Sequence, residues 1–385
     1  MKRILILLLV CLVLICSVCY PGKTPEQPGQ TEQSGQPSEP ETITVRLMAV
    51  GDNLLHDSVS YTAQQPDGSY DYSALYAAMK PVLTQSDLTF INQEVMLTGQ
   101  VSAYPSLAAK GECADALRDA GFNLINLATN HTLDKGISGL EACLQTVHSK
   151  GFDAVMGAFR TKEESTQQII VKKKGIRFGF LAYTYNLNGK GLSADDAWRV
   201  ALIEEQKIRA EVSALRQNCD YLIVSMHWGQ EYKDLQNAKQ ESQAKLLAEL
   251  GVDLVIGTHP HVIQPAVWYD RPDGGKMYCT YSLGNFISNQ RKWATMLGGL
   301  LDITLEFTPD GTLKQVVDAG VIPTVTHYET TTEGSRGHRV CLLQDYTEAL
   351  ASVHGIRDHA GALTLNWLQT HASAVLGDQL RSWKN

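Results

Sequence analysis

Six short apolar runs, each ending abruptly in a polar motif, constrain most strongly what this chain of 385 residues can fold into. The runs are rich in Val, Ile, Leu and Phe and show no alternation with polar residues, which is typical of strands buried on both faces. The runs with their motifs are VRLMAV before Gly51-Asp52, DLTFI before Asn92-Gln93-Glu94, NLINLA before Thr129-Asn130-His131, YLIVSM before His227-Trp228-Gly229, DLVIG shortly before His259-Pro260-His261, and YCTYSL before Gly284-Asn285-Phe286.

Helical patterns lie between these runs, and the alternation predicts an α/β fold. We expect helices over residues 72–85, 113–120, 137–149, 204–217 and 238–250. A β-hairpin is predicted over residues 168–183, turning at Lys174-Gly175. The polar loop that follows, residues 184–197, is expected to edge the site. The last stretch, residues 345–383, is predicted to be helical.

The N-terminal segment has the composition of an export leader. Two basic residues precede an apolar run over residues 4–18, which is shorter than the roughly 20 residues of a comfortable transmembrane helix. Residues 1–20 are therefore predicted to be a signal peptide or membrane anchor. Neither Cys16 nor Cys19 follows the small residue that normally precedes a lipid-modified cysteine. An atypical lipoprotein and an uncleaved anchor are both consistent with the sequence.

The remaining chain divides by composition. Residues 21–42 combine Pro, Gln, Ser, Gly and Glu with almost no apolar side chain, which predicts a disordered linker. Residues 43–325 are predicted to form the main domain, and residues 326–385 a mainly helical extension that packs on it. This order places an exported domain on the extracytoplasmic face of the cell membrane.

The formal net charge of the chain is −8. Such a charge repels a polyanion, so nucleic acid is excluded as an expected partner. An acidic polymer would need metal ions or a local basic patch for capture, and Lys172, Lys173 and Lys174 form one such patch. A solvated hairpin tip is the commoner explanation of that run.

The polar motifs should converge in space, because open α/β sheets form their sites at the carboxyl ends of their strands. Oxygen ligands combined with several imidazoles suit Mn, Fe or Zn. The donors are too many for one ion, so two divalent transition-metal ions bridged by a carboxylate are predicted. The converging side chains are Asp52, His56, Glu94, Asn130, His131, His227, His259 and His261.

Single motifs have simpler explanations. An aspartate beside a glycine is typical of a turn, and Asn130-His131 is consistent with a capping loop before a helix. His227 beside Trp228 is consistent with a satisfied core histidine. Two imidazoles flanking Pro260 have few structural uses, and six motifs at six strand ends together favour a common site.

The motifs GDNLLH, NQE with a following LTG, ATNHTLDKG, HWGQEY, GTHPHVIQP and YSLGNF occur in this order between residues 44 and 288. In this the chain resembles the capsule-synthesis CapA family of poly-γ-glutamate biosynthesis proteins. That family is similar to the calcineurin-like metallophosphoesterases. The resemblance implies a four-layer α/β/β/α sandwich of two mixed sheets with a two-metal site.

The resemblance also implies a role for each donor. The first ion would be held by Asp52 and His261, and Glu94 would bridge the two ions. His131 would stand free of the metals as the acid that protonates a leaving group, with Asp52 beside it in the catalytic centre. The second ion would be held by Asn130, His227 and His259. Three further residues of the motifs are predicted to contact substrate: Asn92, Glu231 and Asn285.

This sequence departs from the phosphoesterase pattern at the first motif. The pattern has a histidine two positions after the first aspartate, where this chain has Leu54, and the nearest candidate to replace it is His56. The bridging aspartate of the pattern is Glu94 here. The added methylene changes ion spacing and substrate geometry.

Two functions are consistent with these residues. In the first, a metal-dependent hydrolase cleaves a phosphoester or an acyl (γ-glutamyl) bond with a water activated by the ions. In the second, the same pocket binds or guides nascent poly-γ-glutamate without turnover. The polymer and integral-membrane synthase subunits are the expected partners in that case.

Overall fold

The computed structural model describes residues 42–384 of the chain. The predicted anchor (residues 1–20) and the predicted linker up to residue 41 lie outside the described residues. Within residues 42–384, no helix is long and apolar enough to cross a membrane.

The first sheet carries the N-terminal half of the site. Its central strand β1 (Ile43–Asn53) pairs in parallel with β2 and antiparallel with β12, so the sheet is mixed. The short strand β11 (Asn285–Ile287) also pairs with the end of β1. The order of the other strands around β1 is β14 (Gly334–Leu342), β13 (Leu313–Thr331), β12 (Leu297–Phe307), β1, β2 (Leu88–Asn92), β3 (Leu124–Asn126) and β4 (Ala154–Met156).

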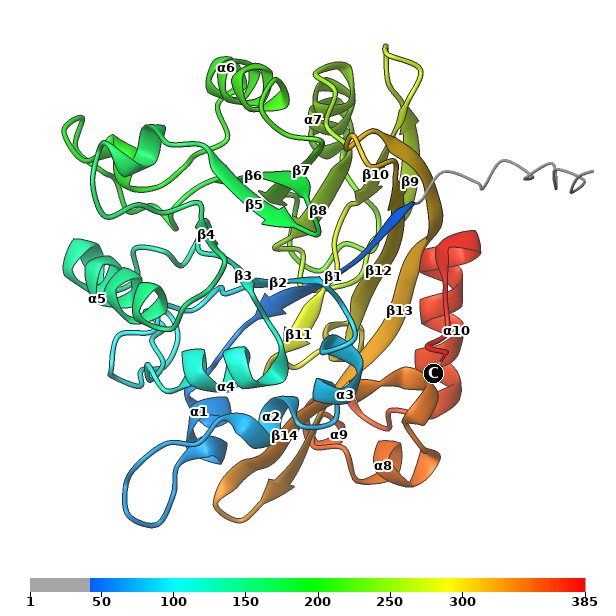
Figure 1. The fold of residues 1–385 in the computed structure, drawn as a ribbon. Helices are drawn as coiled ribbons and strands as arrows, with labels where there is room; N and C mark the ends of the chain where they lie inside the picture. The colour runs from blue at the N-terminus through cyan, green and yellow to red at the C-terminus, as the bar shows by residue number, and fades with distance from the viewer. Residues whose placement is uncertain (1–41, 385) are drawn as a thin grey trace, which may run out of the picture. The chain divides into compact units, whose positions relative to one another are not determined.

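The second sheet is also mixed, because its four inner strands are parallel and both edge strands are antiparallel to their neighbours. Its order is β5 (Ile169–Lys173), β6 (Ile176–Thr184), β7 (Tyr221–His227), β8 (Leu254–Thr258), β10 (Lys276–Thr280) and β9 (Ala266–Asp270). Figure 1 shows the two sheets packed face to face, with β1 and β2 near β8.

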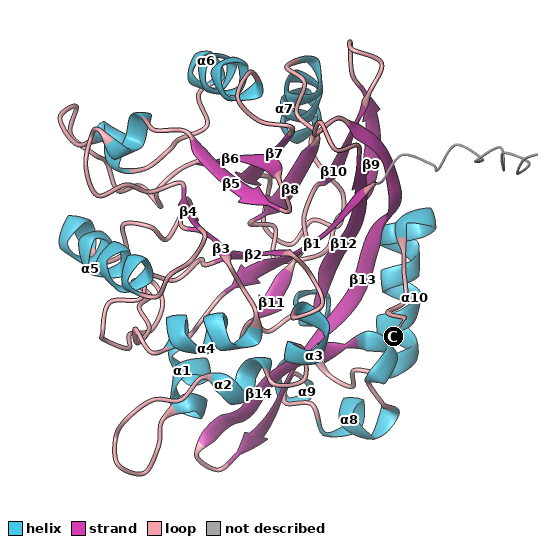
Figure 2. Ribbon diagram, in the orientation of Figure 1, coloured by secondary structure: helices cyan, strands magenta, loops and turns pink. Residues whose placement is uncertain are grey.

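Alternate residues of the buried strands pack into different apolar interfaces. On β1, Met48 and Val50 face the helices of the first sheet, whereas Val45 and Leu47 face the second sheet. A third cluster, which includes Val224 of β7, lies between the second sheet and its own helices. Three interfaces separate four layers, so the predicted α/β/β/α sandwich of two mixed sheets is confirmed. Figure 2 shows the strands enclosed by helices on both sides.

The helices expected between the strands are present, with one exception. On the first sheet they are α4 (Cys113–Ala120) and α5 (Gly136–Ser149), and on the second α6 (Glu205–Arg216) and α7 (Ala238–Glu249). The first sheet also has α1 (Asp57–Ala63), which was not predicted. The single helix expected over residues 72–85 is wrong. Two short helices, α2 (Ser73–Tyr76) and α3 (Lys80–Leu83), occur there because Pro81 has no N–H to continue a helix from α2.

The predicted domain boundary after residue 325 is wrong. That position lies inside β13, which pairs with β12 along its length and continues into β14, so the hairpin belongs to the first sheet. The chain becomes helical only beyond this hairpin, in α8 (Glu348–Val353), α9 (Arg357–Ala360) and α10 (Leu365–Leu376). Helix α10 lies beside β13 (Figure 1) and buries Leu368 and Ala372 in the core.

The predicted hairpin over residues 168–183 is confirmed. Strands β5 and β6 are antiparallel, and both Lys174 and Gly175 have positive φ, which suits a tight hairpin turn. The ammonium group of Lys174 pairs with Asp87 at 2.8 Å. The lysine run lies at the end of β5 and in the turn before β6, whereas His227 lies beside the last residue of β6, so the run does not form a basic patch at the site. The solvated-tip interpretation is correct.

Candidate metal centre

The polar motifs converge where strand ends of both sheets meet. Asp52 is the penultimate residue of β1 and lies beside Asn92 on β2 and Asn285 on β11, and His227 is the last residue of β7. The remaining predicted ligands lie in the segments just after β2, β3 and β8. All of them are buried: Asp52, Glu94, Asn130, His227, His259 and His261.

Gly51 lets β1 approach β11 closely enough to build this site. A Cβ atom at position 51 would overlap the carbonyl oxygen of Gly284. The backbone N–H of Asp52 donates to the same carbonyl at 2.9 Å. The glycine before the aspartate is therefore required by packing between two strands.

The donor atoms form three overlapping groups, and the atoms within each group lie within 4.8 Å of one another. Glu94 belongs to two of these groups, so one carboxylate is shared between two sets of ligands. This is the arrangement that a bridging carboxylate requires. The groups are Asp52 with Glu94 and His261, Glu94 with His227 and His259, and Glu231 with His259 and His261.

Glu94 has no protein donor to satisfy its charge. Its side chain is fully buried, and neither carboxylate oxygen has a hydrogen-bond partner among residues 42–384. The nearest imidazole nitrogens, Nε2 of His261 and Nε2 of His227, lie 3.7 and 3.8 Å from Oε1, too far for hydrogen bonds. An isolated buried carboxylate is costly, so the donor set fits bound cations.

Side-chain amides hold the other ligands in place. Asn92 donates to Asp52 Oδ1 at 2.8 Å and in turn accepts from Asn126 at 2.7 Å. Asn130 Nδ2 donates to Asn188 at 3.1 Å, which leaves Asn130 Oδ1 facing His227 Nε2 at 2.9 Å. The site therefore has little freedom to rearrange before an ion binds.

The His259-Pro260-His261 segment has a strained backbone. Both histidines have positive φ, 96° and 61°, a region that residues with side chains rarely adopt. Two contacts hold the segment: His259 N–H faces the Asp52 carboxylate at 3.3 Å, and the backbone of Tyr232 donates to Pro260 O at 2.8 Å. This conformation brings both imidazoles into the ligand groups.

Burial and charge determine which ligands are neutral. Burial, with the neighbouring His259 and His261, lowers the pKa of His227 well below 6.5, and burial likewise lowers the pKa of His259. Burial and the charge of Asp52 raise the pKa of Glu94 well above 4.5. Burial opposes charge on His261, but Glu94 and Asp52 outweigh it and raise the pKa to about 9. Neutral His227 and His259 keep a nitrogen lone pair for a cation.

His131 stands apart from the three ligand groups of the described residues and is paired with Asp134. Its Nδ1 lies 2.7 Å from Asp134 Oδ2, so the neutral ring donates from Nδ1. The same carboxylate oxygen accepts from the backbone of Leu107 at 2.7 Å. Sequence reasoning missed Asp134, although its spacing of three residues from His131 was the available signal.

A family comparison adds to this geometry. Residues 46–290 match the family described as bacterial capsule synthesis protein PGA_cap, and this range covers more than half of the chain. The chain belongs to the PGA_cap family.

Two curated relatives carry names from capsule synthesis. The PGA biosynthesis protein CapA of Bacillus subtilis (strain 168) is 27% identical over 247 residues, which cover 63% of this chain and 62% of that protein. The capsule biosynthesis protein CapA of Bacillus anthracis is 27% identical over 263 residues, covering 66% of this chain and 61% of that protein. The PGA_cap chain thus spans about three fifths of the length of these relatives.

Several solved structures share part of the architecture of this PGA_cap protein. A 5'-nucleotidase precursor from Thermus thermophilus aligns with a TM-score of 0.46 and 13% identity, over 86% of this chain and 58% of that one. The calcineurin-like phosphoesterase YfkN from Bacillus subtilis aligns with a TM-score of 0.44 and 10% identity, over 87% of this chain and 97% of that one.

Two of the residues predicted to contact substrate in this PGA_cap protein, Asn92 and Asn285, make hydrogen bonds inside the site. Asn92 is buried and holds Asp52, as described above. Asn285 is also buried, and its Oδ1 lies 3.1 Å from His261 Nδ1 while its amide donates to Thr295 O at 3.1 Å. Both amides position ligands. Glu231 is partly exposed and lies among the imidazoles.

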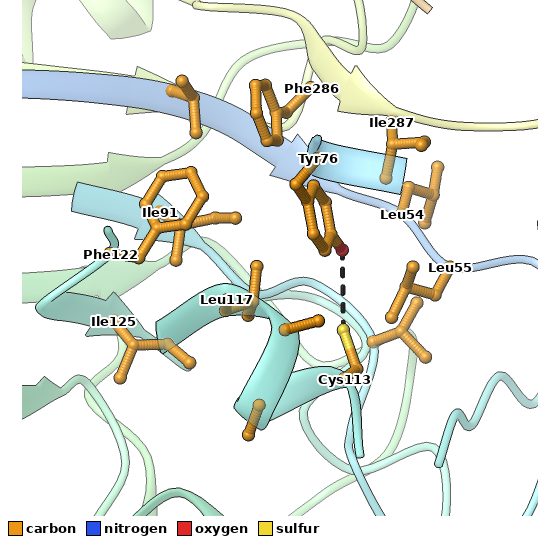
Figure 3. Close-up of a cluster of buried hydrophobic side chains, with 14 of the residues drawn as sticks. Leu54, Leu55, Tyr76, Ile91, Cys113, Leu117, Phe122, Ile125, Phe286 and Ile287 are labelled. Carbon is orange, nitrogen blue, oxygen red and sulfur yellow. Dashed lines mark hydrogen bonds between the residues drawn. The ribbon is translucent and has the colours of Figure 1, made fainter. Parts of the chain in front are cut away.

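His56 does not join any ligand group among the described residues. Its Nδ1 lies 3.2 Å from the carbonyl oxygen of Leu54 and 3.3 Å from the backbone nitrogen of Asn289. The Leu54 side chain packs into the apolar cluster between β1 and α4 (Figure 3). Leu54 is therefore no ligand, and His56 as the replacement for the missing histidine stays a prediction.

The loop after β6 edges the site, as predicted. Asn188 contacts Asn130, and Lys190 donates to the backbone carbonyls of Leu133 and Asp134 at 3.1 and 2.7 Å. The ring of Tyr185 lies over that of His259, with 4.5 Å between centroids. This loop brings an aromatic ring and a positive charge to the metal centre.

Proposed function

We propose that this chain is an exported, membrane-tethered protein of capsule or poly-γ-glutamate synthesis whose two-metal centre hydrolyses a phosphoester or an acyl (γ-glutamyl) bond. Glu94 is the observation that carries the proposal. Its buried carboxylate lacks a hydrogen-bond donor among the described residues and belongs to two ligand groups at once. Two divalent ions would balance this charge.

The ligand groups assign residues to each ion. Asp52, Glu94 and His261 would hold the first, and Glu94, Asn130, His227 and His259 the second. Imidazole with carboxylate and amide oxygen suits Mn, Fe or Zn. When bound, such ions act as Lewis acids and lower the pKa of a water.

His131 supports an acid step in the same reaction. Asp134 accepts the Nδ1 proton of His131 and orients the ring, so a ring protonated on both nitrogens would present its Nε2 proton to the leaving group. Asp134 also accepts from Leu107 N–H, which fixes its own position. Asn92 and Asn285 keep Asp52 and His261 in place during turnover.

The N-terminal anchor is part of the proposal. The apolar run over residues 4–18 and the polar linker after it are what support export and tethering. Cell fractionation with protease treatment of intact cells tests it. We expect the domain in the membrane fraction and accessible from outside, whereas a soluble domain inside the cell would contradict the tether.

The hydrolase is tested with the purified full chain in detergent. Metal analysis should find two transition-metal ions per chain, and the protein should cleave either a generic phosphodiester or a γ-glutamyl peptide. Asp52→Asn and His261→Asn should lose both bound metal and turnover. Glu249→Gln, at an exposed carboxylate on α7, should keep both.

Other outcomes separate the alternatives. A protein without bound metal contradicts the centre itself. A protein with two ions that cleaves neither substrate, while Asp52→Asn still abolishes polymer production in cells, contradicts the hydrolase. That result supports a polymer-guiding role beside integral-membrane synthase subunits.

A further inference from the structure

We propose that Glu231 is a ligand of the first metal ion. This inference rests on the two-metal centre proposed above and names a residue that the phosphoesterase pattern does not assign. Asp52, Glu94 and His261 alone give that ion three protein ligands. Glu231 adds a fourth, whereas Leu54 has no donor atom in its side chain and His56 belongs to no ligand group among the described residues.

The Glu231 carboxylate lies within reach of the centre. An oxygen of Glu231 and nitrogens of His259 and His261 lie within 4.8 Å of one another. His261 is also a member of the group that contains Asp52 and Glu94, and His259 of the group that contains Glu94 and His227, so Glu231 lies beside a ligand of each ion. We assign Glu231 to the first ion because that ion has three other protein ligands, whereas the second already has four. The buried imidazole Nδ1 of His259 has no hydrogen-bond partner in the described part of the chain, as expected for a group that faces a ligand site.

Contacts at both ends fix the segment that carries Glu231. At its start, the indole N–H of buried Trp228 donates to Tyr281 O at 2.9 Å, and the Trp228 backbone donates to Thr258 O at 3.1 Å. At its end, Tyr232 has a φ of 63°, and its backbone donates to Pro260 O. The segment after β7 is thereby held against the His259-Pro260-His261 segment, with Glu231 between the two anchor points.

Leu54 and His56, the two residues near the first motif, make other contacts. The backbone N–H of Leu54 donates to Ile287 O at 3.0 Å, and its side chain lies in the apolar cluster with Leu55 and Tyr76 (Figure 3). The Nδ1 atom of His56 lies 3.2 Å from Leu54 O and 3.3 Å from the backbone nitrogen of Asn289. A side chain from the other sheet therefore completes the first site.

The ligand sets then differ in chemistry. The first ion would have three carboxylates and one imidazole: Asp52, Glu94, Glu231 and His261. The second would have one carboxylate, one amide and two imidazoles. Oxygen-rich sites suit Mn²⁺, whereas imidazole-rich sites suit Zn²⁺. The first site should therefore prefer the harder ion, so that a mixed Mn²⁺ and Zn²⁺ centre forms when both are supplied.

Titration of the metal-stripped full chain with Mn²⁺, followed by metal analysis and electron paramagnetic resonance, tests the inference without an activity assay. The wild type should bind two ions and give a spin-coupled spectrum. Glu231→Gln should bind the first ion more weakly, by about tenfold or more. With only one ion bound per chain, its spectrum should show no spin coupling. Glu231→His, which restores a ligand, should regain the first ion but prefer Zn²⁺ there. Glu249→Gln is the matched control and should behave as the wild type.

The outcomes distinguish this inference from the function on which it rests. Two ions bound by Glu231→Gln with wild-type affinity overturn it, even if turnover falls, because Glu231 would then contact substrate only. If Glu231→Gln does not fold, failure of folded Glu231→His to bind the first ion overturns it. A wild type with two ions but no hydrolysis contradicts the hydrolase and leaves the ligand assignment standing. A wild type without ions contradicts both.

Discussion

At the scale of single residues, the centre depends on side chains that hold other side chains. Asn92 keeps Asp52 in place, Asn285 contacts His261, and Asp134 fixes His131. Only the last of these contacts joins residues that are close in sequence. The precision of the site therefore depends on buried hydrogen bonds whose loss affects function more than stability.

Asp134 is the clearest test of this arrangement. Replacing Asp134 with Ala removes the acceptor of the His131 Nδ1 proton, so the acid is no longer oriented and turnover should fall about 10²-fold or more. The bound metal should remain at two ions per chain, because Asp134 belongs to no ligand group within residues 42–384. Steady-state kinetics with metal analysis checks this.

Two further variants make the result interpretable. Asp119→Ala, at an exposed position of α4, removes a carboxylate that pairs with Lys80 at the surface and should leave kinetics unchanged. Asp134→Asn retains an acceptor for Leu107 N–H in case the alanine variant is unstable. Full turnover in both Asp134 variants would show that His131 does not act as the positioned acid.

At the scale of elements, the contact between β1 and β11 sets the position of Asp52. Gly51→Ala places a methyl group against Gly284 O, so the strands must separate. We expect a loss of about 3 kcal/mol of stability or more, together with loss of metal binding. Gly191→Ala is the control, because a Cβ there meets no atom within 4 Å in the described structure. Urea denaturation and metal analysis measure both; equal stability of the two variants would contradict the role of Gly51.

The C-terminal hairpin and the helix after it carry three buried histidines. Burial lowers the pKa of His327 and His354 to about 4 and that of His338 to about 3. His354 accepts from Ile356 N–H and lies 3.0 Å from Thr326 O, and His338 stacks on Tyr328. These rings are therefore neutral in the folded protein.

Acid should destabilise this region. The unfolded chain, with histidine pKa near 6.5, binds more protons than the folded chain between about pH 6.5 and 4, so stability falls as the pH is lowered through this window. Each histidine should cost on the order of 1–2 kcal/mol at pH 5. His338→Gln should reduce the pH dependence of denaturant unfolding, while exposed His359→Gln should not. Identical pH dependence in both variants would contradict this assignment.

At the scale of the whole molecule, the metal centre joins the two sheets. Its ligands come from the ends of β1 and β2 in one sheet and β7 and β8 in the other. Bound ions would therefore link the two halves of the sandwich. Ligands that bind only the folded state stabilise it by about 4 kcal/mol at a thousandfold excess over Kd.

Metal removal should lower the melting temperature of the wild type. Under chelation, Glu94→Gln should be more stable than the wild type, because it removes a buried carboxyl group that has no donor among residues 42–384 and whose ionisation is opposed by burial and by Asp52. With Mn²⁺ it should gain less than the wild type. Calorimetry with and without chelator measures this, and Glu249→Gln should follow the wild type. A Glu94→Gln protein that is less stable than the wild type under chelation would contradict the cost of the buried Glu94 carboxyl group.

The sequence alone determined the α/β class, the hairpin at Lys174-Gly175 and the strand-end position of the ligands. These features depend on local patterns: apolar runs predict buried strands, and polar motifs at their ends predict a site. It did not predict the long β13, because pairing with a distant strand depends on tertiary contacts. The break at Pro81 has a local cause, the missing N–H of proline, and could have been read from the sequence.

The tertiary structure alone decided how the donors are shared. The position of Glu94 in two ligand groups, the positioning roles of Asn92 and Asn285, and the approach of Glu231 to His261 all join residues far apart in the chain. Sequence spacing contains no information on such distances. The opening pattern of six strand-end motifs named the types of ligand, and the meeting of the two sheets determined which side chains can act on the same ion.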